Sequence, residues 1–504
     1  MSSTGLLFIS SVTKAHSFCL KAAKFVNKVL YVKFKGNTSN SLSLISKEIE
    51  SLYSKATPQF KNLDIRLILK PHVTDTNIKT GQPVDIVLYE NNLSKEAEKF
   101  KQCIVNSGGG VKLQNIDDCD IEVIVDKEPV QQYEYVALGG TFDRLHNGHK
   151  ILLSQAVLRS TKHVTVGVTD VNMIQSKKLF ELIEPLETRM KAVLDFLNDV
   201  NSDLDYNVFP LHDLYGPTKD DPRFQLIVVS EETGRGATKI NEKRIENGLK
   251  PMDTYEVKLA QDSRQSEEEE LKVSSSNQRM RLLGTMLKPP VPNSRIPDWP
   301  YVIGLAGGIA SGKSCIADKL KAKGAAIVNC DVLAHDLYKP GLPLNATLAD
   351  NFGKHIITET GEVDRRKLGQ IVFSDTNELE KLNQLVWPAV IEEARRQIRA
   401  LGAKGHRVVV MEAAVMVRAE WYQYCHQLWT VIIPPEEAIK RLQKRNNLTE
   451  EEARQRIEAQ PSNLEQVALA NIVFSPYWSY EYTQGQVDRA WQHLQEFLDK
   501  RDKI

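Results

Sequence analysis

The stretch "VIGLAGGIASGKSCIADKL", residues 302–320, constrains the fold of this chain more than any other part of it. An apolar run leads into the pattern GxxxxGK[ST], which begins at Gly307, and a helical pattern follows directly. Glycines in such a loop let backbone N–H groups turn toward a phosphate, and the helix N-terminus adds positive potential. Lys313 would reach the β- and γ-phosphates of ATP, and the hydroxyl of Ser314 would hold Mg²⁺. The predicted ATP-binding residues are Gly307, Gly308, Ile309, Ala310, Ser311, Gly312, Lys313 and Ser314.

Apolar runs of strand length alternate with helical stretches from this loop onward. They read "YVIGLAGG", "AAIVNCD", "HRVVVMEA", "LWTVIIP" and "NIVF". Alternation of this kind predicts a parallel sheet covered by helices. Residues 301–504 are therefore predicted to form an α/β domain.

Two polar segments of this domain are candidates for phosphoryl-transfer chemistry. Asp331, in "VNCDVLAHDLY", follows the second predicted strand, where a carboxylate can orient or deprotonate an acceptor hydroxyl. The Arg-rich helix–turn–helix pattern of residues 440–460 can form a lid, in which Arg441, Arg445 and Arg456 close over the phosphates. For both segments a solvated loop or helix face is the simpler alternative.

Together these residues resemble the dephospho-CoA kinase family across residues 301–495, and "VDRRKLGQIVF", "WPAV" and "RVVVMEAAVM" add to the resemblance. It implies ATP-dependent phosphorylation of the ribose 3′-hydroxyl of dephospho-CoA, with Asp331 as the base. Two positions depart from the family pattern. Asn329 stands where the first acid of a D-x-D pair is usual, and Arg418 stands where an acid is common. Glu412, at the place of another family acid, is the alternative base.

A second candidate site lies in "GGTFDRLHNGHK", residues 139–150, between a strand-like and a helix-like run. His146 and His149 would share one side of the first helical turn. Zinc binding lacks a third ligand at a recognisable spacing, and a general-base histidine is a further alternative. We favour a phosphate role, in which imidazole N–H groups and the helix N-terminus stabilise charge on a phosphorus centre. Gly148 would leave room for a ligand beside the backbone.

This motif belongs to a second predicted α/β domain, residues 131–287. Its strand candidates are "YEYVAL", "HVTVGV", "YNVFPL", "FQLIVV" and "TYEVKL", which again alternate with helical stretches. Near its end, "KVSSSNQRMRLLGTML" starts a helix with serines that can cap it and donate to phosphate oxygens, followed by Arg279. A plain serine cap is the alternative.

"GTFDRLHNGH" and "VSSSNQR" resemble the two signatures of the HxGH nucleotidyltransferase superfamily. "TDVNMIQSKK", "LYGPTKDDP" and "VVSEETGRG" narrow the resemblance to eukaryotic-type phosphopantetheine adenylyltransferases. It implies in-line attack of the 4′-phosphopantetheine phosphate on the α-phosphorus of ATP, with release of pyrophosphate and no covalent enzyme intermediate. The implied catalytic residues are His146 and His149. The implied phosphate-binding residues are Thr141, Lys177 (or Lys178 in its place), Ser275, Ser276 and Arg279.

The first part of the chain, residues 1–130, reads as a mixed α/β region without a catalytic pattern. Its strand candidates are "KVLYVKF", "DIRLIL", "PVDIVLY" and "IEVIVD", with helices near 41–54 and 94–106. Residues 1–47 carry lysines but no acidic residue. This suggests either mitochondrial targeting, to the outer membrane or the matrix, with peripheral membrane association, or an ordinary basic start to a folded domain. Five prolines in residues 288–300 predict a stiff linker.

Composition indicates which partners and which compartment suit the chain. The 65 basic and 65 acidic residues cancel, so no overall field favours nucleic acid, and no apolar run nears the length of a spanning helix. Six cysteines without a CxxC pair argue against a disulfide framework and for a reducing compartment. We therefore expect a cytoplasmic protein, with mitochondrial association as the alternative.

The predicted fold class is α/β: two parallel-sheet nucleotide-binding domains, one Rossmann-like and one of P-loop kinase type, after an N-terminal α/β-like region. The product of the first implied reaction is the substrate of the second, and this order is similar to that of the animal bifunctional coenzyme A synthases. The expected partners are 4′-phosphopantetheine, dephospho-CoA, ATP and Mg²⁺. Two alternatives remain: a fusion acting on nicotinamide nucleotides, and a regulatory binding protein with one decayed site, which Asn329 and Arg418 would explain.

Overall fold

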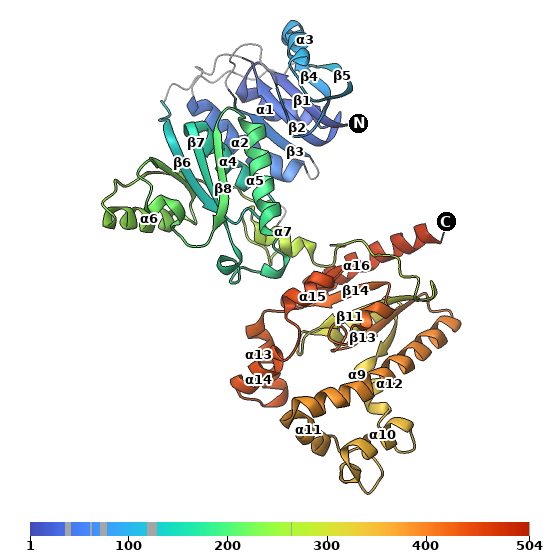
Figure 1. Ribbon diagram of the computed structural model, residues 1–504. Helices are drawn as coiled ribbons and strands as arrows, with labels where there is room; N and C mark the ends of the chain where they lie inside the picture. Colours follow the sequence, from blue (N-terminus) through green and yellow to red (C-terminus); the bar gives the residue numbers. More distant parts are fainter. Residues whose placement is uncertain (36–41, 61–62, 71–77, 118–128, 264, 503–504) are drawn as a thin grey trace. The chain divides into compact units, whose positions relative to one another are not determined.

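The computed structural model describes residues 1–35, 42–60, 63–70, 78–117, 129–263 and 265–502 (Figure 1). These residues form two compact units, Met1–Arg279 and Met280–Ile504. Within the described ranges the first unit holds two five-stranded sheets and the second unit holds one. Parallel sheets flanked by helices confirm the predicted α/β class. The domain boundaries 131–287, 288–300 and 301–504 stay a prediction.

The first sheet has the strand order β3-β2-β1-β4-β5, and all of its neighbouring strands are parallel. Leu6, Leu7 and Phe8 of the central strand β1 are buried, as expected for a strand covered on both faces. The basic start of the chain is therefore part of a folded domain. The elements are β1 (Ser2–Ile9), α1 (Ala15–Ala22), β2 (Val26–Phe34), α2 (Leu42–Gln59), β3 (Asp64–Ile68), β4 (Val84–Glu90), α3 (Ser94–Gln102) and β5 (Ser107–Ile116).

The second sheet has the order β10-β9-β6-β7-β8 and is also parallel throughout. The histidine-containing turn follows β6, beside the point where the strand order reverses, and such points are where doubly wound sheets bind ligands. The elements are β6 (Tyr133–Gly140), α4 (Asn147–Arg159), β7 (Ser160–Thr169), α5 (Leu186–Val200), β8 (Asp205–Leu211), β9 (Leu226–Ser230), α6 (Gly234–Glu246), β10 (Asp253–Val257) and α7 (Ser275–Leu282).

The third sheet has the order β12-β13-β11-β14-β15 and is parallel. All seven residues of its central strand β11 are buried, and the predicted phosphate-binding loop leaves the end of that strand. The elements are β11 (Tyr301–Gly307), α8 (Lys313–Ala322), β12 (Ala326–Asn329), α9 (Cys330–Asp336), α10 (Pro343–Phe352), α11 (Arg365–Ser374), α12 (Thr376–Ala403), β13 (Val408–Glu412), β14 (Gln427–Val431), α13 (Pro435–Asn446), α14 (Glu450–Glu458), α15 (Asn463–Leu469), β15 (Ile472–Phe474) and α16 (Tyr480–Arg501).

The strands predicted from apolar runs after residue 131 are all present. In the N-terminal region the structure confirms β2, β3 and β4, whereas the predicted strand "IEVIVD" lies outside the described residues. Strands β1 and β5 were not predicted, because β1 begins with two serines and β5 begins with a serine and three glycines, which are not typical of strands.

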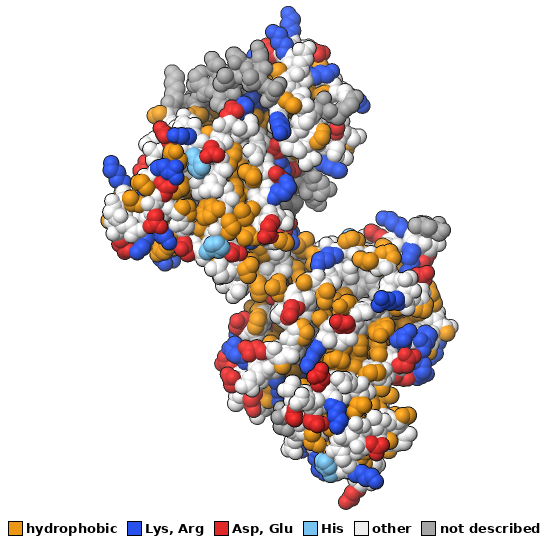
Figure 2. Space-filling view, viewed as in Figure 1, with side chains coloured by type: hydrophobic (Ala, Val, Ile, Leu, Met, Phe, Trp, Pro, Cys, Tyr) orange, Lys and Arg blue, Asp and Glu red, His pale blue; other side chains and the backbone are white. Residues whose placement is uncertain are grey.

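The distribution of charged side chains, the state of the cysteines and the character of the helices can be stated for the described residues. Basic and acidic side chains are interspersed over the visible face of both units (Figure 2). The five cysteines in the described ranges are free thiols. Among the described residues, no helix combines the length and the apolar character needed to cross a membrane.

Candidate active sites

The phosphate-binding loop joins β11 to α8 and is held in shape by glycines. Gly307 (φ 151°) and Gly312 (φ 94°) adopt positive φ angles that other residues rarely adopt. A Cβ atom at Gly307 would lie 2.6 Å from the carbonyl oxygen of Val431. The Nζ of Lys313 donates to the carbonyl oxygens of Gly307 at 2.8 Å and Gly308 at 3.2 Å. The lysine is therefore folded back over the loop that it is predicted to serve.

Glu412, at the end of β13, lies directly beside this loop. Its carboxylate accepts hydrogen bonds from Ser314 Oγ at 2.8 Å and from Asn329 Nδ2 at 2.9 Å. Burial raises the pKa of Glu412, although Ser314 and Lys313 oppose the shift. An aspartate at position 329 would set a second carboxylate against Glu412, so the amide of Asn329 suits this neighbour. Burial lowers the pKa of Lys313, and the negative charges of Asp331 and Glu412 oppose this shift. The three charged side chains therefore belong to one group.

The predicted lid is formed by α13 and α14, and it contacts the phosphate-binding loop. The Oε1 of Gln460 accepts a hydrogen bond from the backbone N–H of Ile309 at 2.7 Å. Arg441 Nη2 donates to the carbonyl oxygen of Pro476 at 2.9 Å, whereas Arg445 and Arg456 are exposed. The apolar side of the lid packs on the loop through Ile309, Ala310, Ile439, Leu442, Leu448, Ala453 and Ile457.

His146 and His149 lie together at the start of α4. Their rings stack with centroids 3.8 Å apart and an interplanar angle of 19°, and the backbone N–H of His146 donates to His149 Nδ1 at 3.5 Å. A Cβ atom at Gly148 would lie 3.2 Å from the His146 ring, so this glycine makes space for the imidazole itself. The Nδ1 of His146 is buried without a hydrogen-bond partner in the described part of the chain.

Asp143, which sequence reasoning missed, connects the two predicted halves of this site. It is fully buried, and it accepts hydrogen bonds from Arg279 Nη1 at 2.6 Å and from Arg144 Nη1 at 2.9 Å. Ser275 Oγ donates to the Asp143 carbonyl oxygen at 2.9 Å and lies 3.4 Å from His146 Nε2. The serine-capped helix and the histidine turn, far apart in sequence, therefore meet in one site.

Further cations surround this group. Arg189, also missed, is 1% exposed and donates to the carbonyl oxygen of Thr141 at 2.8 Å. Partial burial is the main cause that lowers the pKa of Lys177, and the positive charges of Arg279 and Arg189 lower it as well. The carbonyl oxygen of Lys178 accepts a hydrogen bond from Arg279 Nε at 2.9 Å. The predicted residues that the structure brings together here are Thr141, His146, His149, Lys177, Ser275, Ser276 and Arg279.

The histidine pair should stay neutral under mildly acidic conditions. Burial lowers the pKa of His149 to about 4, with Asp143 opposing the shift, and burial also lowers the pKa of His146 well below its ordinary value. We expect an NMR titration of His149 to show no protonation between pH 7 and 5.5, whereas a midpoint near the ordinary value of about 6.5 would contradict this. Because the unfolded state binds the proton more readily, the unit should lose stability as the pH falls from about 6.5 toward 4. His149→Gln, which cannot titrate, should remove that share of the pH dependence.

Comparisons with known proteins match both parts of the chain that hold these sites. A family model described as dephospho-CoA kinase matches residues 301–476, and one described as cytidylyltransferase-like matches residues 137–281. The dephospho-CoA kinase of Carboxydothermus hydrogenoformans is 40% identical over 186 residues, which are 37% of this chain and 90% of the relative. The chain belongs to the dephospho-CoA kinase family.

Two other relatives extend this finding. The dephospho-CoA kinase of Syntrophus aciditrophicus is 37% identical over 193 residues, covering 38% of this chain and 82% of the relative. A dephospho-CoA kinase domain-containing protein of Danio rerio is 34% identical over 199 residues, which are 39% of this chain and 87% of the relative. One polypeptide thus carries a dephospho-CoA kinase domain and a cytidylyltransferase-like domain, an arrangement consistent with a bifunctional coenzyme A synthase. Membership of the kinase family implies ATP as a substrate.

Proposed function

We propose that the chain catalyses two consecutive reactions. In the first, the phosphate of 4′-phosphopantetheine attacks the α-phosphorus of ATP, and dephospho-CoA and pyrophosphate form. In the second, the kinase domain transfers the γ-phosphoryl group of a further ATP to the ribose 3′-hydroxyl of dephospho-CoA. The proposal joins the kinase family to a site in the preceding unit, whose proposed product is the kinase substrate.

The observation that carries the first reaction is the cationic group around the histidine turn. Arg279, Arg189 and Lys177 lie close enough to influence one another, and Asp143 pairs with Arg279, while Asp170, Glu184 and Glu187 act on Arg189. These guanidinium and ammonium groups are donors suited to the triphosphate of ATP and the pyrophosphate that leaves. The neutral imidazoles can donate N–H groups to the oxygens of the phosphorus under attack, which needs no proton transfer to the protein.

Dephospho-CoA formation is tested with the purified chain and two candidate acceptors. Incubation with ATP and 4′-phosphopantetheine should release pyrophosphate and yield dephospho-CoA, and then CoA when the kinase step proceeds. Nicotinamide mononucleotide is the competing acceptor, since other nucleotidyltransferases can use the same phosphate machinery. Turnover of nicotinamide mononucleotide alone would contradict the proposed first reaction.

In the kinase domain, we propose that Asp331 orients and deprotonates the 3′-hydroxyl. Asp331 follows β12 and belongs to the same charged group as Lys313 and Glu412. Mg²⁺, bound with ATP, would neutralise phosphate charge. Ser314 Oγ and Glu412 Oε1, 2.8 Å apart, are hard oxygen donors that fit this ion. Within the described ranges no group of three or more His, Cys, Asp or Glu could hold a metal ion, so phosphate and water oxygens would complete its coordination.

Replacing the proposed base tests its role directly. Asp331→Asn should lower the phosphoryl-transfer rate by about two orders of magnitude or more, the scale of losing a general base. The rate is measured with dephospho-CoA supplied, so the first reaction does not limit it. Asp336→Asn, on the same helix α9, is the matched control. A near-native rate for Asp331→Asn would transfer the base role to Glu412.

A further inference from the structure

The two sheets of the first unit have the same topology. If β1 to β5 are matched in chain order with β6 to β10, both sheets read 3-2-1-4-5, and both are parallel throughout. The register shifts near the start of the central strand in each, between Ser2 and Thr4 and between Tyr133 and Tyr135. The kinase sheet differs, since it reads 2-3-1-4-5 by the same convention. The first unit is therefore an internal structural repeat that the sequence does not reveal.

In the part of the first copy that the structure describes, the turn after the central strand carries no counterpart of the His146–His149 pair. In the first copy the switch point lies at the carboxyl ends of β1 and β4, where Glu90 is fully buried. Its carboxylate accepts hydrogen bonds from the Ser10 N–H at 2.8 Å and from Lys14 Nζ at 2.5 Å. Doubly wound sheets bind their ligands at this point, and here Glu90 already neutralises Lys14, so the pair offers a phosphate no net positive charge. The first copy is thus unsuited to bind a second ATP in the same place.

The first copy instead holds the helix that carries the histidines. Lys150 is buried in the first part of α4, and its Nζ donates to Asp64 Oδ1 of β3 at 2.5 Å and to the Ile65 carbonyl oxygen at 3.3 Å. Asp64 also accepts from Arg66, which donates to Asp199 of α5 at 2.5 Å. Burial alone would raise the pKa of Asp64, but Lys150 and Arg66 lower it below its ordinary value. Positive and negative side chains alternate along this series of contacts, so each charged group has a neighbour of opposite charge.

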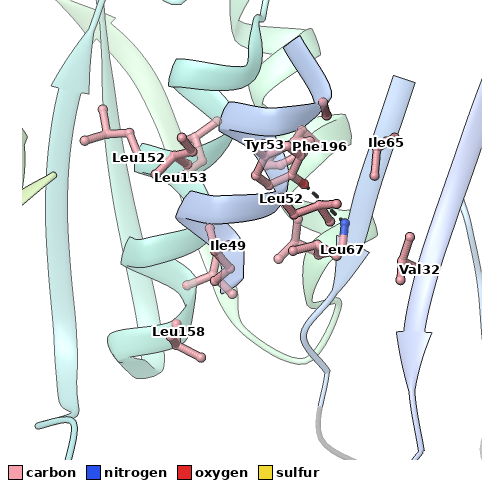
Figure 3. Close-up of a cluster of buried hydrophobic side chains, with 14 of the residues drawn as sticks. Val32, Ile49, Leu52, Tyr53, Ile65, Leu67, Leu152, Leu153, Leu158 and Phe196 are labelled. Carbon is pink, nitrogen blue, oxygen red and sulfur yellow. Dashed lines mark hydrogen bonds between the residues drawn. The ribbon is translucent and has the colours of Figure 1, made fainter. Parts of the chain in front are cut away.

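Apolar packing joins the same elements. Figure 3 shows side chains of α2, β3 and α4 in one cluster. In addition, Asn147 Nδ2, between the two histidines, donates to the Tyr53 carbonyl oxygen at 3.2 Å and to Thr57 Oγ1 at 3.0 Å. The residues labelled in the cluster are Val32, Ile49, Leu52, Tyr53, Ile65, Leu67, Leu152, Leu153, Leu158 and Phe196.

We propose that residues 1–116 are a catalytically silent copy of the nucleotidyltransferase fold that positions helix α4, with Asp64 acting as a positioning residue through Lys150. The backbone N–H of Lys150 donates to the His146 carbonyl oxygen at 3.0 Å, which links the anchored lysine to the first catalytic turn. Asp64 touches no reacting group; it fixes the orientation of the stacked imidazoles. The inference rests on the proposed adenylyl transfer for its kinetic consequence and on geometry alone for the anchoring.

The test compares the two activities of one full-length chain. Asp64→Asn should lower kcat for dephospho-CoA formation by about tenfold or more, because small misplacements of catalytic groups are costly. The KM for 4′-phosphopantetheine should change by less than about twofold, and the kinase rate with supplied dephospho-CoA should be unchanged, because the kinase machinery lies in the other unit. In the double variant with Lys150→Met, the loss should be smaller than the sum of the two single losses, since both charges are gone.

Glu96→Gln is the matched control, because it removes an exposed ion pair with Lys35 in the same copy. An unchanged kcat in folded Asp64→Asn, with only a lower melting temperature, would overturn the positioning role. If Asp64→Asn does not fold, Thr57→Val, which removes the acceptor used by Asn147 and the local hydrogen bond from Thr57 to the Tyr53 carbonyl oxygen, is judged by the same criteria. Hydrogen exchange of the α4 amides should rise in either variant. If the wild-type chain does not use 4′-phosphopantetheine, the proposed function fails, and this exchange result alone decides the anchoring.

Discussion

Lys313→Ala should abolish CoA formation from dephospho-CoA while dephospho-CoA formation from 4′-phosphopantetheine continues. The Lys313 ammonium lies over the phosphate-binding loop, within 3.2 Å of two loop carbonyl oxygens. No other lysine in the loop could pair with the β- and γ-phosphates. We expect the kinase rate to fall by about a thousandfold or more, which corresponds to roughly 4 kcal/mol of transition-state stabilisation.

The measurement follows both products of one chain by chromatography, with dephospho-CoA supplied for the second step. Lys321→Ala is the matched control, since Lys321 is an exposed lysine on the same helix α8. It should leave both rates near the wild-type values. If Lys313→Ala removed both activities from a folded chain, two independent sites would be untenable.

The converse result is expected for His149→Ala, which should abolish adenylyl transfer and spare the kinase. The His149 ring stacks on His146, so its removal takes away one donor and the support of the other. Loss of one preorganised donor costs about a hundredfold to a thousandfold in rate. Because the neutral imidazole is the proposed donor, His149→Gln, which keeps an N–H group, should retain more activity than His149→Ala.

His163→Ala supplies the control for this pair. His163 lies near the start of β7, at the end of the sheet opposite the site, where it contacts Asp205 and Thr165. Its replacement should leave kcat for dephospho-CoA formation within about twofold of wild type in the folded protein, because the ring lies at the opposite end of the strands from the histidine turn. An adenylyl-transfer rate for His149→Ala close to that of His163→Ala would refute the catalytic role of the histidine turn.

Local patterns were enough to predict the loop and the turn, because their residues are consecutive. Gly307, Gly312 and Lys313 lie in one short segment of sequence, so their spacing alone identifies them. The strand runs on either side are apolar and β-branched, which is why the class of the fold could also be predicted. The function assigned to the kinase domain followed from these segments taken together.

Long-range pairings could not be predicted in the same way. Asp143 meets Arg279 across 136 residues of sequence, and Arg189 has no motif around it that marks a buried cation. The repeat in the first unit is a property of strand order, which no single strand displays. Asn329 was interpreted as a departure from a family pattern, and only the position of Glu412 gives it a physical reason.

The hydrogen bond between Ile309 and Gln460 has a consequence for nucleotide affinity. The backbone donor that a phosphate oxygen would use already has a partner in the lid. Binding ATP is then an exchange of acceptors, so the gain is the difference between two hydrogen bonds and not one whole bond. Such an exchange favours quick release of spent nucleotide, because Gln460 can reclaim the N–H as ADP departs.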